Sequence, residues 1–114
     1  MDTWDINSLD VQTHQPKVLR SDAEARVIAI NLPSGERLAD HQVHERAYLL
    51  VTDGEIELSA GDGSTTGGAG FTAHFEANER HEVTAKADSR LVLLLAPWPG
   101  EGHSSERAGG GSPA

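Results

Sequence analysis

Histidines with a neighbouring carboxylate are the residues of this chain whose types and spacing best suit chemistry. His41, His44 and Glu45 lie in the segment DHQVHERAY, and His81 lies in NERHEV. Imidazole nitrogens bind divalent Zn, Fe, Ni, Cu and Mn, and a carboxylate favours the harder of these ions. A cluster of His41 and His81 with either His44 or Glu45 would therefore hold one divalent ion, with Zn, Fe, Mn and Ni as candidates.

The spacing of these residues leaves a second interpretation open. In a strand, residues two apart share a face, so His41, Val43 and Glu45 point one way and His44 the other, unless a turn intervenes. His41 and His81 would then be hydrogen-bonded polar residues without a metal, able to act as general acid and base or to anchor a ligand. His74 alternates with apolar neighbours, which predicts that it faces solvent.

Alternation of apolar and polar residues with period two predicts that strands position these histidines. Asp53-Gly54 lies between two such runs and indicates a hairpin, because glycine accepts a positive φ at no steric cost. The Gly-rich segment 61–70 predicts a turn-rich connection, and the run LVLLLA within 90–96 predicts a strand buried on both faces. The remaining strands are expected at 26–32, 48–51, 55–59, 71–75 and 82–85. No window predicts a helix, so the fold class is all-β, a sandwich or barrel.

Length, charge and composition limit the classes of partner. The chain has 114 residues, no Cys and a formal net charge of −9, which fits one domain in a reducing, cytoplasmic compartment. A negative field repels phosphate backbones and anionic lipid, so neither nucleic acid nor a membrane is an expected partner. We expect a lead-in or edge strand over 1–24, the barrel over 25–99, and a flexible Gly/Ser-rich tail over 100–114.

Two segments resemble the short motifs of the cupin superfamily. In the first, Gly35 is followed after five residues by His41, and Gly54 closes the motif, but Val43 and Ala47 stand where the family has a His and a Glu. In the second, Gly70 and His81 match, and residues 76–78 (EAN) replace Pro-x-Gly. Asn78 can stand in for glycine because it tolerates the left-handed conformation.

This resemblance implies a small cupin-type jelly-roll barrel, a double-stranded β-helix, that binds a small molecule at its open mouth. The family's usual metal shell is three His and one Glu. Only His41 and His81 match it, since Val43 and Ala47 cannot ligate, so a metal requires His44 or Glu45. Dioxygenase, isomerase and lyase activities occur among cupins, as do non-catalytic, metal-free binding or sensing modules, and the sequence does not separate them.

The residues near the histidines also suggest where a ligand would lie, and the resemblance suggests a second subunit. Tyr48, Arg46, Val43 and Ala47 are the expected ligand-binding residues beside the histidines, with Arg80 and Arg37 as further carboxylate clamps. Small cupins commonly form homodimers, which implies a homodimer here. Its candidate contacts are Trp4, Ile6 and Leu9, or residues 97–99, although Trp98 can instead close one end of its own barrel.

Overall fold

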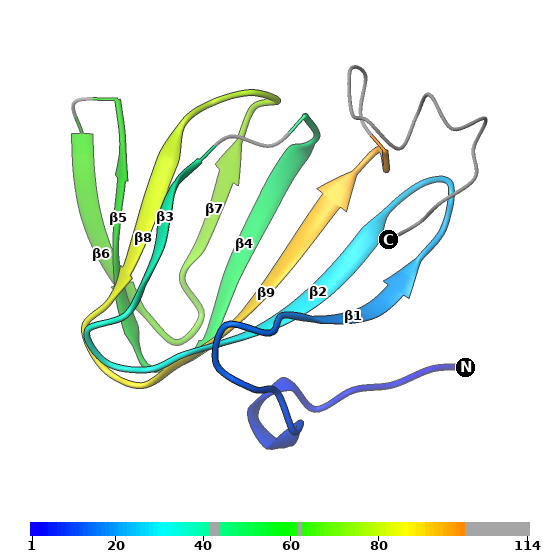
Figure 1. The fold of residues 1–114 in the computed structure, drawn as a ribbon, viewed down its shortest axis with the longest axis horizontal. Helices are drawn as coiled ribbons and strands as arrows, with labels where there is room; N and C mark the ends of the chain where they lie inside the picture. Colours follow the sequence, from blue (N-terminus) through cyan, green and yellow to red (C-terminus); the bar gives the residue numbers. More distant parts are fainter. Residues whose placement is uncertain (42–43, 62, 100–114) are drawn as a thin grey trace.

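Two antiparallel sheets facing each other form the body of the protein (Figure 1). The computed structural model describes residues 1–41, 44–61 and 63–99, with the backbone alone for residues 39–41. One sheet has the strand order β1-β2-β9-β4-β7 and the other β3-β8-β5-β6. The elements are η1 (Ile6–Ser8), β1 (Lys17–Ser21), β2 (Arg26–Leu32), β3 (Arg37–His41), β4 (Arg46–Asp53), β5 (Glu55–Ala60), β6 (Gly63–Gly68), β7 (Thr72–Phe75), β8 (His81–Ala85) and β9 (Ser89–Ala96). The predicted all-β jelly-roll barrel is confirmed.

The sequence predicts a hairpin at Asp53-Gly54, and this expectation is wrong: the turn there joins β4 to β5, but the two strands do not pair, because β4 lies in the five-stranded sheet and β5 in the four-stranded sheet. Gly54 has φ +92°, in the left-handed region that glycine adopts without strain. A Cβ at this position would overlap the carbonyl oxygen of Asp88 and the Oγ of Ser89. Glycine is therefore required here both for its backbone conformation and for its lack of a side chain.

The segment 61–70 corrects one sequence-based expectation, because it contains a strand and is not only a connection. β6 pairs with β5 along its whole length, from Glu55 opposite Gly68 to Ala60 opposite Gly63. Its Ser, Thr and Gly residues carry no apolar pattern, which is why periodicity did not indicate a strand. Gly67 has a packing role, since a Cβ there would overlap the ring of Phe71.

The hydrophobic core lies between the two sheets, and β9 crosses its centre. Leu91 and Leu95 on β9 are buried against residues of β4 and β5 such as Leu49 and Ile56. Val92 and Leu94, by contrast, are only partly buried and stand outside the core cluster. The prediction that this aliphatic strand is buried on both faces is therefore wrong for the single chain, because Val92 and Leu94 on its outer face are only partly buried.

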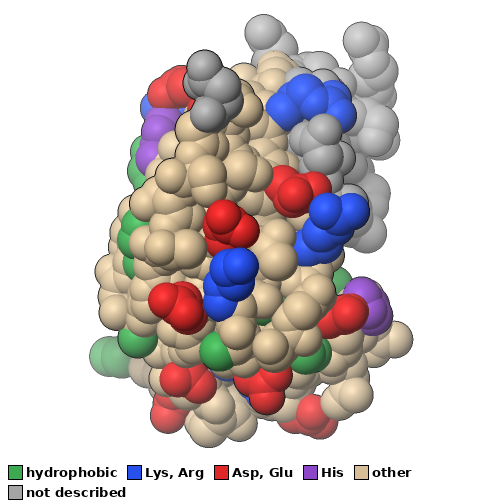
Figure 2. All heavy atoms as spheres, turned by 90° about the vertical axis from the view of Figure 1, so that its left-hand side faces the viewer, with side chains coloured by type: hydrophobic (Ala, Val, Ile, Leu, Met, Phe, Trp, Pro, Cys, Tyr) green, Lys and Arg blue, Asp and Glu red, His purple; other side chains and the backbone are tan. Residues whose placement is uncertain are grey.

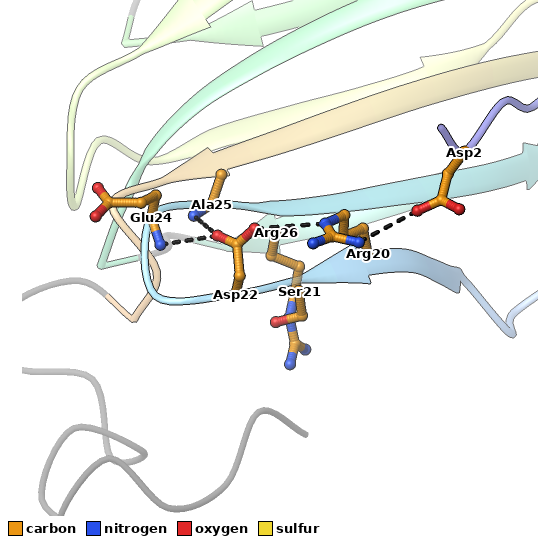
Figure 3. Close-up of polar contacts among 7 residues, drawn as sticks. All are labelled: Asp2, Arg20, Ser21, Asp22, Glu24, Ala25 and Arg26. Carbon is orange, nitrogen blue, oxygen red and sulfur yellow. Dashed lines mark hydrogen bonds and ion pairs between the residues drawn. The ribbon is translucent and has the colours of Figure 1, made fainter.

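A tight turn held by Asp22 joins β1 to β2 (Figure 3). The Asp22 Oδ1 accepts hydrogen bonds from the amides of Glu24 at 2.9 Å and Ala25 at 3.1 Å, and Arg20 lies beside its other oxygen at 3.5 Å. The two amides, and after them the Arg20 charge, lower the pKa of the Asp22 carboxyl below its ordinary value. These hydrogen bonds hold residues 22–25 in a turn.

We expect an NMR titration to find the Asp22 carboxyl pKa below that of an unstructured Asp. A carboxyl with a depressed folded-state pKa stabilises the fold above its unfolded pKa of about 3.9, and this contribution is lost as the pH falls through the folded value. The Asp22→Asn variant should therefore lose less stability than the parent protein when the pH is lowered below about 4. An ordinary Asp22 pKa would contradict this account of the turn.

The segment before β1 lies across the lower part of the outer face of the five-stranded sheet (Figure 1). Arg90 Nη1 donates to the carbonyls of Leu9 at 2.7 Å and Ile6 at 3.1 Å, and Asn31 Nδ2 donates to that of Val11 at 3.1 Å. Val11 is buried beneath this contact.

The expected tail, 100–114, lies outside the described residues. Within the described residues, no helix has the length and apolarity to cross a membrane.

Candidate functional site

His81 is the first residue of β8 and lies at the end of the barrel where β3 and β5 end and β4 and β8 begin, called here the His81 end (Figure 1). Its side chain is 5% exposed, and its Nδ1 lies 3.1 Å from the carbonyl oxygen of Glu79. A carbonyl can only accept, so this contact assigns the proton of the neutral ring to Nδ1 and the lone pair to Nε2. The backbone thus fixes both the tautomer and the orientation of the ring.

Phe75 connects His81 to the opposite sheet. The two rings are stacked, with centroids 3.9 Å apart and planes 10° from parallel. Phe75 pairs with Ala47 across β7 and β4, and both residues are buried. The side chains of Phe75 and Ala47 therefore make the apolar wall beside the imidazole.

The turn before β8 contains Asn78 at φ +67°, which confirms that asparagine takes the glycine conformation there.

Two buried side chains of opposite charge lie at the same end of the barrel. Glu45, just before β4, is 1% exposed, and Arg26, the first residue of β2, is 7% exposed. The Arg26 guanidinium lies over the Trp98 ring, 4.0 Å from its centroid, and Arg26 Nε donates to Ser21 Oγ at 3.1 Å. Burial lowers the pKa of Arg26, and the Glu45 charge opposes that shift. Arginine remains protonated at neutral pH, so Glu45 faces a permanent positive charge.

A cavity of about 370 Å³ opens beside His81. It is lined by Ser59, Ala60, Gly61, Arg80, His81 and Glu82. Its volume lies within the range of small-molecule sites. By strand alternation, Ser59 and Glu82 belong to the outer face of the four-stranded sheet, whereas His81 belongs to its inner face, so the cavity lies at the rim of the barrel. Acidic and basic side chains intermingle on the side of the molecule nearest β6 (Figure 2), and Arg37 pairs with Glu82 at 3.3 Å.

The structure brings together only some of the predicted site residues. The backbones of His41 and His81 pair directly across β3 and β8, although the His41 side chain lies outside the described residues, as does Val43. Glu45 and Ala47 are buried at the His81 end, whereas His44 is exposed.

Tyr48 and Arg46 lie elsewhere, on the outer face of the five-stranded sheet and not at the mouth. Tyr48 is 40% exposed and contacts the ring of His74, with centroids 4.8 Å apart. Arg46 is also exposed and shares the outward face of β4 with Tyr48. His74 is exposed there, as its alternation predicted. The sequence assigned Tyr48 by its nearness to the histidines along the chain, but strand alternation turns it away from the interior.

The described side chains do not fit a complete metal shell. Among the residues whose side chains the structure describes, no three His, Asp or Glu groups converge on one point. The bend at residues 44–45 does turn Glu45 inward, as a metal site would require, but the Glu45 charge also acts on the buried Arg26 guanidinium and raises its pKa. A divalent ion bound to Glu45 would be repelled by that second cation.

Two facing antiparallel sheets with a polar cavity at one end of the barrel define a double-stranded β-helix protein. A family model described as the cupin domain matches residues 29–97, which is more than half of the chain. The chain therefore belongs to the cupin family. A search of curated proteins finds no match.

Solved structures of low sequence identity share the fold. An uncharacterized conserved protein with a double-stranded β-helix domain from Klebsiella pneumoniae is 20% identical, with 87% of this chain and 92% of that chain covered and a TM-score of 0.75. A cupin superfamily protein from Desulfitobacterium hafniense is 12% identical (80% and 85% covered, TM-score 0.72). KdgF from Halomonas sp. is 18% identical (80% and 90% covered, TM-score 0.70).

Sequence reasoning missed Arg26 and its contact with Trp98. A signal for it was present in the sequence. Arg26 lies two and four residues before Ile28 and Ile30, so its side chain shares the face of β2 that points into the barrel. A charged residue at an inward position of a strand requires a buried partner. Ser59 gave no such signal, since a lone serine at the end of a strand is common.

Proposed function

We propose that this cupin binds a small polar molecule in the cavity beside His81, without a resident metal ion. The observation that carries the proposal is the cavity of about 370 Å³ with Arg80, Ser59 and the oriented imidazole of His81 in its lining. A concave site with a few convergent polar groups is the usual form of a ligand site. Binding, and not a defined reaction, is the proposed activity, and a cytoplasmic location is part of the proposal.

The lining favours a small hydroxycarboxylate as the class of ligand. The Arg80 guanidinium is suited to bind a carboxylate, since its planar donors match the two oxygens. The Ser59 hydroxyl can donate or accept, and the Glu82 carboxylate can accept from a ligand hydroxyl. The volume matches a molecule of a few carbon atoms.

A divalent ion held by His41, His81 and Glu45 is the second candidate. It is supported by the inward orientation of Glu45 and by the hydrogen bond at His81 Nδ1, because metal-ligating histidines commonly donate their other nitrogen to a carbonyl. Elemental analysis of untagged protein distinguishes the candidates. One equivalent of metal that is lost in His81→Ala would establish the second and end the metal-free proposal.

We expect His81→Phe to weaken hydroxycarboxylate binding at least about ten-fold, since the variant keeps a ring against Phe75 but removes both nitrogens. Isothermal titration calorimetry with malate, glycerate and gluconate measures the effect, and succinate reports on the hydroxyl. His74→Phe is the matched control, because His74 also contacts an aromatic ring but lies on the outer face. Equal binding by His81→Phe and the parent protein, or no binding of any of these acids, would refute the proposal.

A further inference from the structure

A second cavity, of about 340 Å³, opens at the end of the barrel opposite the His81 end. It lies where the segment before β1 meets the turns that join β2 to β3, β4 to β5 and β8 to β9 (Figure 1). Polar and charged residues make most of its lining: Asn7, Asn31, Asp53, Asp88, Ser89 and Arg90. We call it the Arg90 cavity. Its volume is close to that of the cavity beside His81, and its lining indicates a polar ligand.

Arg90 and Asp53 are direct neighbours in this cavity that do not pair with each other. They lie opposite one another on β9 and β4, at a register shift that follows Val51. Directly opposed residues of antiparallel strands have Cα atoms about 5 Å apart, and opposite charges placed there can form an ion pair. Within the described residues, however, the Asp53 carboxylate makes no hydrogen bond or ion pair. Two opposite charges thus line one cavity, both able to bind a ligand.

The segment before β1 determines which part of the Arg90 guanidinium remains for a ligand. Nη1 donates to the carbonyls of Leu9 at 2.7 Å and Ile6 at 3.1 Å, which uses both of its protons. Nε and Nη2 have no partner in the part of the chain that the structure describes. These two nitrogens form an edge of the guanidinium that binds a carboxylate through two parallel hydrogen bonds. The N-terminal segment therefore orients Arg90 and leaves this edge available.

Asp88 adds a second carboxylate from the neighbouring turn. Its Oδ1 accepts from the Ser34 amide at 2.8 Å, which anchors the side chain, whereas Oδ2 has no partner within the described residues. The turns that carry the two aspartates touch, because a Cβ at Gly54 would overlap the Asp88 carbonyl oxygen. Asp53, Asp88 and Arg90 together place two negative charges and one positive charge on the lining.

We propose that the Arg90 cavity binds a basic α-amino acid, a molecule with one carboxylate, an α-ammonium and a second ammonium on its side chain. The ligand carboxylate binds Nε and Nη2 of Arg90, the α-ammonium binds Asp53, and the side-chain ammonium binds Asp88. Carboxylate and α-ammonium are attached to the same carbon atom, which suits the direct opposition of Arg90 and Asp53. The single positive charge of the ligand complements the lining, and the field of a chain of charge −9 attracts it.

Other classes of ligand use this lining less completely. A divalent cation would be repelled by Arg90, and among the described side chains no three His, Asp or Glu groups converge on one point. A diamine would leave the edge of Arg90 unused, and a neutral amino acid would leave Asp88 without a cation. The inference goes beyond the function proposed above, because it concerns the opposite end of the barrel and none of the residues beside His81.

Isothermal titration calorimetry of the full chain with lysine and ornithine tests the class of ligand. Three analogues each lack one of the recognised groups: cadaverine lacks the carboxylate, Nα-acetyl-lysine the α-ammonium and norleucine the side-chain ammonium. We expect each to bind at least about ten-fold more weakly than lysine, because each loses a charge-assisted contact. No saturable binding of lysine or ornithine, or cadaverine binding as tightly as lysine, overturns the proposal.

Substitutions assign the binding to the Arg90 cavity. Asp53→Asn keeps the shape of an exposed side chain that has no partner within the described residues, so the fold should be retained, and we expect lysine to bind at least about ten-fold more weakly. Glu24→Gln is the matched control, since it removes an exposed carboxylate from the β1–β2 turn at the other end of the same sheet (Figure 3). Equal losses in the two variants would show only a general attraction to an acidic protein and would overturn the proposal.

Arg90→Lys keeps the positive charge but removes the edge that binds a carboxylate. We expect this variant to lose the preference for lysine over cadaverine. His81→Phe should bind lysine like the parent protein, so a failure of this inference and a failure of the function proposed above are distinguishable. In NMR spectra of the parent protein, lysine should shift the Arg90 Nε–H and Asn31 side-chain amide signals and leave Gly61 unchanged. A preference retained in Arg90→Lys, or shifts spread over the whole protein, contradicts the proposed site.

Discussion

Arg26→Ala is expected to lower the free energy of unfolding by about 3–5 kcal/mol, because it removes a buried cation whose charge interacts with the buried Glu45 carboxylate. Arg26 and Glu45 are 7% and 1% exposed, and the same substitution removes the contact between the guanidinium and the Trp98 ring. Urea unfolding followed by tryptophan fluorescence measures the loss. A loss below about 1 kcal/mol would show that the pair does not contribute as a buried charge pair.

Two further variants separate the pair from general effects of charge. Arg20→Ala removes an arginine whose side chain is 60% exposed and whose carboxylate partners are also at the surface, so we expect a change below about 1 kcal/mol. The double variant Arg26→Met, Glu45→Leu removes both charges. It should be more stable than Arg26→Ala alone, since apolar residues often replace a buried ion pair at little cost. If the double variant loses as much stability as Arg26→Met and Glu45→Leu lose separately in sum, the two residues are not directly coupled.

Gly54→Ala is expected to destabilise the protein by about 2–5 kcal/mol, combining strain in the left-handed region with steric overlap. The new Cβ would overlap the backbone of Asp88 and the hydroxyl of Ser89. Ser89 cannot move freely, because its Oγ accepts from the Glu55 amide at 3.1 Å and donates to the Ala87 carbonyl at 2.7 Å. The β4–β5 turn would therefore be displaced.

Gly70→Ala is the matched control for the Gly54 substitution. Gly70 has φ +93°, close to the +92° of Gly54, but a Cβ there meets no atom within 4 Å. It should therefore report the conformational cost alone, about 1–2 kcal/mol. Equal losses at the two positions in urea unfolding would show that the overlap at Gly54 relaxes without cost.

The sequence predicted the parts of the fold that local chemistry determines. Asp53-Gly54 forms a turn, as expected, because glycine adopts the left-handed conformation without strain, but the strands that it joins lie in different sheets and do not form the expected hairpin. β6 was missed because it is held by main-chain pairing with β5 and by the close approach of Phe71 to Gly67, and neither leaves an apolar pattern. The exposure of Val92 and Leu94 was also not predictable, since the sequence does not reveal how many faces of a sheet one chain covers.

The sequence predicts where His81 and Glu45 lie in the candidate site, but not which side chains surround them. His81 and Glu45 lie at the expected end of the barrel because strand parity and the bend before β4 place them there. Tyr48 was assigned from its nearness along the chain, and alternation turns it outward. Arg26 lies nearly twenty residues from Glu45 in sequence, so their pairing depends on β2 and β4 both flanking β9.

The central place of β9 affects when this protein can fold during its synthesis. It is the last strand among the described residues, yet it separates β2 from β4 and pairs with both along their length. Until the ribosome has released residue 96, both neighbours present open edges that can pair with other chains. Folding of this sheet therefore waits for β9 and depends on contacts distant in sequence, which favours slow folding.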